Sequence, residues 1–182
     1  MTLFINACIR GDSRTRRLTE RLMERWDDPV TEVNLGEIAF GPTDEAYLAR
    51  RDRLLAEGRF EDPMFGLARQ FAAADRIVIA APYWDLSFPA VLKQYIEKIN
   101  VPGITFYYTQ EGVPRGLCRA KELYYVMTAG GMYVPPEFGF GYVEALAKYF
   151  YGIREVRFIQ AAGLDIDGAD PEQILADVNL ES

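Results

Sequence analysis

The stretch Arg76–Pro82 (RIVIAAP), which runs directly into Tyr83–Pro89 (YWDLSFP), decides the fold. After Arg76, the stretch RIVIAAP has no polar side chain, which is typical of a parallel strand covered by helices on both faces. Ser87 and Pro89 favour a helix start immediately afterwards, and apolar side chains then recur at helical spacing until Pro102. A buried strand followed by such a helix is typical of a βαβ unit, so the sequence predicts parallel strands joined by helices.

The same alternation of strand and helix continues on both sides of this stretch. Further strands are predicted at Thr2–Ala7, Val30–Leu35, Glu122–Thr128 and Arg154–Ala162, and helices at Ser13–Asp27, Asp44–Glu57, from Asp62 and Pro63 onward, around Tyr142–Tyr151 and at Pro171–Val178. Ile104–Thr109 is predicted as an added strand or hairpin arm, followed by glycine and proline turns. Right-handed crossovers then predict an α/β, flavodoxin-like three-layer sandwich. It would be a single domain over residues 1–182, with five parallel strands in the order 2-1-3-4-5 and an inserted hairpin.

The composition excludes several classes of function. The 182 residues include 20 Lys and Arg against 27 Asp and Glu, a net charge of −7, which argues against nucleic acid as a main partner. Histidine is absent, which excludes catalytic triads and His-ligated metal sites. The two cysteines, Cys8 and Cys118, predict neither a disulfide framework nor a metal site. No apolar run approaches the ~18 residues of a membrane span. We therefore expect a reduced, cytoplasmic protein with no membrane partner.

The first candidate binding loop follows strand one, because ligands of this fold bind at the carboxyl edge of the sheet, where strands one and three part. It reads CIRGDSRTRR, which is neither a Walker A loop nor a dinucleotide fingerprint. Arg10, Ser13, Arg14 and Thr15 surround a helix start, and arginines in a first turn oppose the helix dipole. A bound phosphate would remove that conflict. The alternative is that Asp12 or Ser13 is an ordinary N-cap and the arginines face water.

The second candidate loop follows the buried strand at the same edge. Two aromatic residues and an acid are unusual in a turn between a strand and a helix. They could wall a flat ring system and place a polar group at its margin; alternatively, the rings are large side chains that cap the core. The residues concerned are Pro82, Tyr83, Trp84, Asp85 and Leu86.

The third candidate loop begins TAGGMY after strand four. Two consecutive glycines there would let the backbone approach a ligand closely and would free N–H donors. The alternative is an ordinary turn before the next helix. The candidate binding residues are Thr128, Ala129, Gly130, Gly131 and Tyr133.

These segments together resemble a known family. APYWDLSFPAVLKQYIEKINVPGITFYYTQEGVPRGL (residues 81–117), followed by a strand and TAGG, is similar to the FMN-dependent NADH-azoreductases and NAD(P)H quinone dehydrogenases. The resemblance implies that residues 13–15 hold the FMN phosphate, that residues 83–86 line the isoalloxazine, and that Gly130 and Gly131 donate to its pyrimidine edge. This chain departs from the family in its arginine-bearing first loop, in Asp85 where many members have Asn, and in Ala129 before the glycines.

The function implied by this resemblance is reduction of quinones or azo compounds by NADH or NADPH, in two-electron ping-pong steps through FMN. No protein residue is assigned as catalytic, because the flavin itself carries the hydride. A flavodoxin-type electron carrier or a flavin reductase would use the same fold. A more remote alternative is a response-regulator-like switch, for which Asp12 and Asp85 would be the acids.

The distribution of aromatic residues predicts a homodimer with active sites at its interface. Rings gather in the hairpin and in the segment after the glycines, and both groups are expected near the carboxyl ends of strands three and four. Too many rings gather there for one small domain to cover, and a two-fold partner would bury them. Phe106, Tyr108 and Phe138 are the predicted substrate-pocket residues. The alternative is a hairpin that folds back over its own sheet.

Overall fold

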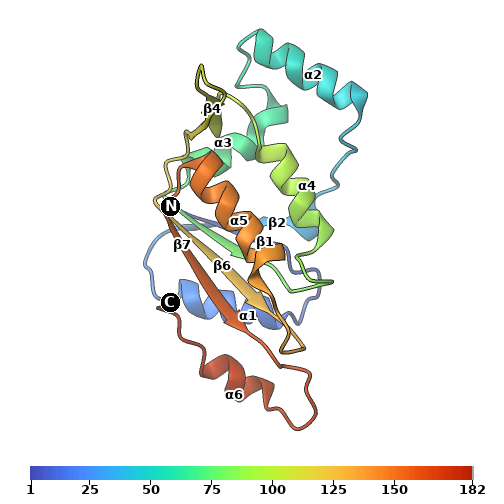
Figure 1. The fold of residues 1–182 in the computed structure, drawn as a ribbon, viewed down its shortest axis with the longest axis vertical. Helices are drawn as coiled ribbons and strands as arrows, with labels where there is room; N and C mark the ends of the chain where they lie inside the picture. The colour runs from blue at the N-terminus through green and yellow to red at the C-terminus, as the bar shows by residue number, and fades with distance from the viewer. Residues whose placement is uncertain (182) are drawn as a thin grey trace.

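Five parallel strands form the centre of the molecule in a computed structural model, which describes residues 1–181 (Figure 1). They are β1 (Thr2–Asn6), β2 (Val30–Asn34), β3 (Arg76–Ala80), β6 (Glu122–Thr128) and β7 (Glu155–Ala161). Their order is β2-β1-β3-β6-β7, and every neighbouring pair is parallel. This confirms the predicted α/β, flavodoxin-like sheet. The assignment of residues 1–182 to a single domain stays a prediction, and its last residue lies outside the described range.

The helices cover both faces of this sheet. They are α1 (Arg14–Met23), α2 (Glu45–Ala56), α3 (Gly66–Ala73), α4 (Ala90–Ile99), α5 (Phe140–Leu146) and α6 (Pro171–Ala176). Of these, α2 extends away from the sheet instead of covering it (Figure 1). Phe4 and Val78 pack with α1 and α6 on one face, whereas Leu3 and Ile77 pack with α3, α4 and α5 on the other. No helix in the described part of the chain combines the length and the apolar character needed to span a bilayer.

Several predicted element boundaries shift in the structure. The helix expected over Ser13–Asp27 ends at Met23, because the N–H groups of Arg25 and Trp26 bond three residues back instead of four. Pro63 begins a 3₁₀ turn, with Asp62 as its N-cap, before α3 starts at Gly66. The helix expected around Tyr142–Tyr151 begins at Phe140 and ends in a π-helical turn.

The inserted hairpin lies at the amino edge of the sheet, opposite the loops that follow the strands (Figure 1). Its strands are β4 (Phe106–Tyr108) and β5 (Pro114–Gly116), which form a two-stranded antiparallel sheet separate from the parallel one. The Arg119 N–H donates to the Ala72 carbonyl, just before β3 begins, at 2.9 Å. The expectation that the hairpin lies near the carboxyl ends was therefore wrong. Helix α4 runs antiparallel to the strands and returns the chain to their amino ends before the hairpin starts.

The aromatic residues of the hairpin divide into a buried and an exposed group. Phe106 is 4% exposed and packs edge-on against Phe150, with ring centroids 4.9 Å apart. Tyr107 and Tyr108 are 46% and 54% exposed. The hairpin therefore buries one ring against its own chain and leaves two at the surface.

Candidate functional site

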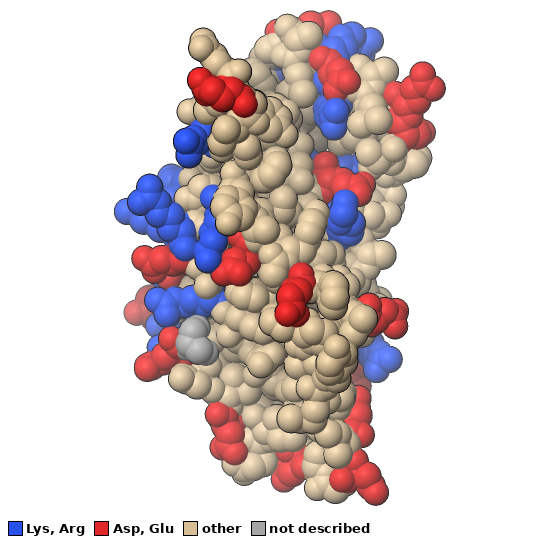
Figure 2. Space-filling view, in the orientation of Figure 1, with Lys and Arg blue, Asp and Glu red and all other residues tan. Residues whose placement is uncertain are grey.

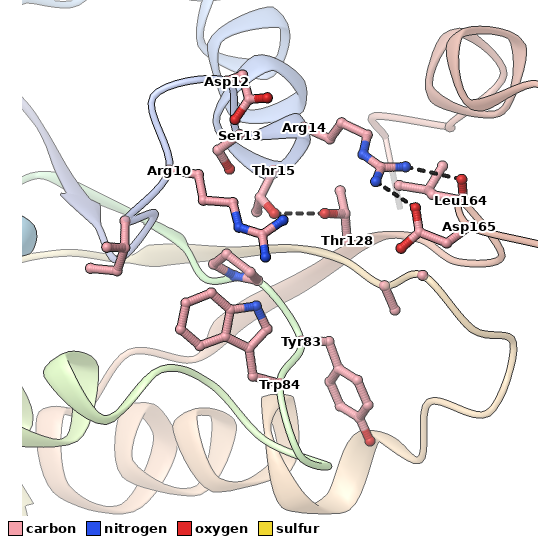
Figure 3. A pocket seen from close by; sticks show the side chains of 14 residues that line it. Arg10, Asp12, Ser13, Arg14, Thr15, Tyr83, Trp84, Thr128, Leu164 and Asp165 are labelled. Atoms are coloured by element: carbon pink, nitrogen blue, oxygen red, sulfur yellow. Dashed lines mark hydrogen bonds and ion pairs between the residues drawn. The ribbon is translucent and has the colours of Figure 1, made fainter.

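A cleft of about 240 Å³ lies at the carboxyl edge of the sheet, between the loops that follow β1, β3, β6 and β7 (Figure 3). The predicted residues that line it are Arg10, Ser13, Arg14, Thr15, Pro82, Tyr83, Trp84, Thr128, Ala129 and Gly130. All three predicted loops therefore contribute to one cleft. Convergence at this edge follows from the parallel sheet, in which every strand ends on the same side.

The floor of the cleft joins α1 to β6. The hydroxyls of Thr15 and Thr128 lie 2.6 Å apart and are both buried, so they hydrogen-bond to each other. Ser13 is the N-cap of α1, and its Oγ accepts a hydrogen bond from the Arg16 N–H at 3.3 Å. The N-cap interpretation of Ser13 is thus confirmed. Among the N–H groups of the first turn, those of Arg14 and Thr15 are not used by this cap and remain available to a ligand.

The arginines of the first helical turn are paired with protein carboxylates. Arg14 donates to the Leu164 carbonyl at 3.0 Å and to Asp165 Oδ1 at 2.6 Å. Arg16 contacts Glu20 and Glu32, and Arg17 contacts Glu172. These acids offset the conflict with the helix dipole. The conflict with the dipole alone therefore does not require a bound anion, and the interpretation that these arginines simply face water was wrong. Phosphate binding at this loop stays a prediction.

Arg10 differs from the arginines of the first turn. It lines the cleft and is exposed, and within residues 1–181 its guanidinium makes no hydrogen bond or ion pair (Figure 3). A free guanidinium beside a helix N-terminus is a strong local attractor for an anion.

The second loop is a tight turn at the rim of the cleft. Trp84 and Ser87 exchange two backbone hydrogen bonds of 2.9 and 2.8 Å, which leaves Asp85 and Leu86 as the two central residues. Both have positive φ, 50° and 66°. Asp85 and Leu86 do not line the cleft, whereas Tyr83 and Trp84 do. Of the acid pair that a phosphorylation switch would need, only Asp12 lies at the cleft.

Tyr83 stands at the junction of the second and third loops. Its hydroxyl donates to the Pro135 carbonyl at 3.4 Å, and Ser87 Oγ donates to the Phe138 carbonyl at 3.0 Å. Partial burial, followed by the nearby Tyr133 and Glu137, raises the pKa of Tyr83, so its hydroxyl stays protonated at neutral pH.

The two glycines of the third loop have different surroundings. A Cβ at Gly130 would overlap the Asp165 side chain, whereas a Cβ at Gly131 would meet no atom within 4 Å. Gly130 therefore serves packing within the chain, and Gly131 leaves open space. Gly131 itself does not line the cleft, and neither does Tyr133, which is 79% exposed.

The sequence-based reasoning missed part of the cleft wall. Leu164 and Asp165 line it from the loop after β7, Ile9 lines it from the first loop, and Asp12 was considered only as a helix cap or a switch acid. The signal for the β7 loop was present, because β7 was predicted to be the neighbour of β6 and must end at the same edge.

Both cysteines behave as core residues, as expected. Burial raises the pKa of the Cys8 thiol to about 11 and that of the Cys118 thiol to about 12. Neither thiol provides a reactive thiolate at neutral pH.

Comparison with known proteins agrees with this geometry. Residues 1–181 match the family described as flavodoxin-like fold. An FMN-dependent NADH:quinone oxidoreductase from Coprothermobacter proteolyticus is 33% identical over 181 residues, which cover 94% of this chain and 89% of that protein. FMN-dependent NADH:quinone oxidoreductase 2 from Clostridium acetobutylicum is 36% identical, over 93% of this chain and 88% of that protein.

Solved structures show the same fold. An FMN-dependent NADH-azoreductase from Bacillus anthracis, crystallised with FMN, superposes with a TM-score of 0.79 at 22% identity, over 96% of this chain and 92% of that chain. An NAD(P)H:quinone oxidoreductase from Methanothermobacter marburgensis superposes with a TM-score of 0.69 at 17% identity, over 96% of this chain and 93% of that chain. The sheet order agrees with the family match and with these relatives. The chain belongs to the flavodoxin-like fold family that includes the FMN-dependent NADH:quinone oxidoreductases.

Proposed function

We propose that the protein is an FMN-dependent NAD(P)H oxidoreductase that reduces quinones or azo compounds. The observation that carries this proposal is the cleft at the carboxyl edge, which has an unpaired Arg10 at one side and the rings of Tyr83 and Trp84 at another (Figure 3). Such a cleft suits a ligand with an anionic end and a flat ring system. The named activity of relatives that match almost the whole chain supports the same function.

The donors around the cleft fit FMN. The first-turn N–H groups of α1, together with Ser13 and Thr15, would face the phosphate. Tyr83 and Trp84 would contact the ring system, and the backbone at Gly130 and Gly131 would hydrogen-bond its polar edge. Asp85, Leu86 and Tyr133 lie outside the cleft lining, and we propose that they reach the bound cofactor from its rim.

The chain's own groups bind, orient and shield, and no side chain of the cleft is assigned a proton transfer. Bound between the first turn of α1 and the rings of Tyr83 and Trp84, FMN would supply the redox chemistry, namely transfer of hydride from NAD(P)H and of two electrons to the acceptor. Trp84, 40% exposed at the rim, would limit the access of water to the rings. The neutral Tyr83 hydroxyl, held against Pro135, keeps the second and third loops in contact.

We also propose a homodimer with shared sites. The cleft of one chain is smaller than the ~300–1,000 Å³ typical of ligand pockets, and the rings at its margin are exposed. Figure 2 shows few charged side chains in the lower middle of the face drawn, over the loop that follows β6. Tyr108 lies at the opposite edge of the parallel sheet from the cleft of its own chain, so it could contribute to a substrate pocket only in a partner's site. Phe106, which was also predicted to line that pocket, is 4% exposed and packs against Phe150 within its own chain. Phe138 could contribute to the cleft of its own chain.

The test is purification followed by two measurements. We expect a yellow protein with one FMN per chain that oxidises NADH or NADPH in the steady state when benzoquinone or an azo dye is present. Bound FMN without turnover would indicate an electron carrier, and a colourless protein that fails to quench added FMN would refute the proposal. We also propose a cytoplasmic location, because Cys8 and Cys118 are both free.

A further inference from the structure

We infer that the two arginines of the first loop have separate roles. Arg10 binds the phosphate and sets the preference for FMN over riboflavin, whereas Arg14 is a positioning residue that fixes the wall of the cleft. This inference rests on the proposed function. The inference goes beyond the proposed function, because the sequence pattern places both arginines in the phosphate loop and the resemblance assigns the phosphate to residues 13–15, which include Arg14 and not Arg10.

Arg14 is committed to the loop after β7. Its guanidinium donates to the Leu164 carbonyl at 3.0 Å and to Asp165 Oδ1 at 2.6 Å (Figure 3). Arg14 is also the first member of a stripe of arginines that follows α1 and continues just past its end. Arg17 contacts Glu172, Arg21 donates to the carbonyls of residues 175 and 178, and Arg25 donates to the carbonyl of residue 180. The stripe fastens the chain's last segment to α1, and Arg14 fastens the part nearest the cleft.

Moving Arg14 onto a phosphate would break these contacts. Leu164 would lose a partner for its carbonyl, and Asp165 would remain as an unpaired carboxylate in the wall of a site that holds a phosphate. The negative charges of Asp165 and the phosphate would repel each other. This repulsion would offset the free energy that a new ion pair between Arg14 and the phosphate contributes. Arg10 has no such contacts to lose, because its guanidinium is unpaired within the described residues.

The Arg14 contact also reaches the glycine loop. The Asp165 side chain packs where a Cβ at Gly130 would lie, and the Asp165 N–H donates to the Gly130 carbonyl at 3.0 Å. Arg14 therefore holds Asp165, and Asp165 holds the backbone at Gly130. Because that backbone faces the cleft, loss of Arg14 should disturb the ring end of the site, which FMN and riboflavin share.

The test compares affinities for FMN and riboflavin, measured by quenching of flavin fluorescence on the full chain freed of flavin. Arg10→Met should weaken FMN roughly tenfold or more and leave riboflavin within about twofold, because only FMN carries the charged partner. Arg14→Met and Asp165→Asn should each weaken FMN and riboflavin by the same factor. The double variant should be no worse than either single one, since both break the same contact.

Arg17→Met is the matched control. It removes an exposed ion pair one turn along the stripe and outside the cleft, so both affinities should match those of the unmodified chain. The melting temperature of flavin-free Arg14→Met should be close to that of Arg17→Met, which separates positioning from global instability. The visible circular dichroism of bound flavin should change in Arg14→Met and Asp165→Asn but not in Arg17→Met.

Selective loss of FMN in Arg14→Met would overturn the inference. So would an Asp165→Asn variant that gains affinity for FMN relative to riboflavin, because this would show that the released Arg14 reaches the phosphate. Asp165→Asn keeps every arginine, so it decides the question even if Arg14→Met fails to fold. An unmodified chain that binds neither flavin would instead refute the proposed function itself.

Discussion

The two edges of the parallel sheet are built from turns of different kinds. At the cleft edge, the turn Trp84–Ser87 holds Asp85 at φ 50° and Leu86 at φ 66°, in the region that favours glycine. At the hairpin edge, the residues with positive φ are glycines, Gly103 and Gly112 among them. A side chain in the left-handed region costs about 1–2 kcal/mol, so the chain carries backbone strain beside the cleft and avoids it at the hairpin. Such strain is concentrated at functional sites in proteins.

The edges also differ in how closely the backbone is packed. Gly116 in the hairpin lies directly against the backbone of Tyr151 and Gly152, whereas Gly131 at the cleft has no protein atom near its missing Cβ. The hairpin edge is closed by contacts within the chain. At the cleft edge the backbone is open at Gly131, as a ligand site requires, and is packed against Asp165 at Gly130.

The largest expected effect tests the closed edge. Gly116→Ala would place a methyl group on the Tyr151 backbone, which can yield only if the hairpin moves. We expect a loss of about 1–3 kcal/mol in the free energy of unfolding, measured with urea. Gly131→Ala is the control and should change that free energy by less than about 0.5 kcal/mol. Equal losses would contradict the difference between the two edges.

The next effect tests the proposal that the hairpin edge of one chain meets the cleft edge of another. Tyr108→Asp should raise the dissociation constant of the dimer about 30-fold, as for an interface residue worth about 2 kcal/mol, and should lower quinone reduction. Sedimentation across a dilution series measures the constant. Phe106 is unsuitable for this test because it is buried in its own chain.

Tyr107→Asp serves as the control for the dimer. Successive side chains of a strand point to opposite faces, so only one of the two tyrosines should lie at the interface. Loss of the dimer in Tyr107→Asp alone, or a monomer that stays active at high dilution, would refute the shared site.

A smaller effect tests the open edge. Gly131→Val should lower flavin affinity about tenfold if the ligand occupies the space beside this residue, which corresponds to about 1.4 kcal/mol. The free energy of unfolding in urea should change as little as it does in Gly131→Ala. A variant that unfolds readily, yet binds FMN normally in its folded fraction, would show that the glycine serves only the turn.

The fold was predictable because the decisive pattern is local. RIVIAAP between two helices already predicts a buried parallel strand, and the alternation of five strands with helices fits the flavodoxin-like order that the structure has. The place of the cleft could be predicted from the same pattern, since a residue directly after a parallel strand must lie at the carboxyl edge of the sheet. The hairpin was misplaced because it follows a helix, and the helix had carried the chain back to the amino edge.

The pairing of the arginines could not be predicted in the same way. Arg14 and Asp165 are 151 residues apart, and no local pattern connects them. The strain at Leu86 was also hidden, because a two-residue turn with positive φ usually contains glycine or asparagine. Both features are properties of the folded chain alone.

The smallest expected effect measures the strain at the cleft turn itself. Leu86→Gly and Leu86→Ala remove nearly the same side chain, but only alanine keeps a Cβ at φ 66°. We expect the glycine variant to be more stable by about 1 kcal/mol, since left-handed backbone disfavours any Cβ by about that amount. The reverse change at the other edge, Gly112→Ala at φ 76°, should destabilise the protein by a similar amount. Urea unfolding of the three variants decides the matter. If Leu86→Ala is as stable as Leu86→Gly while Gly112→Ala is destabilised, the cleft turn relaxes in solution and the two edges do not differ in strain.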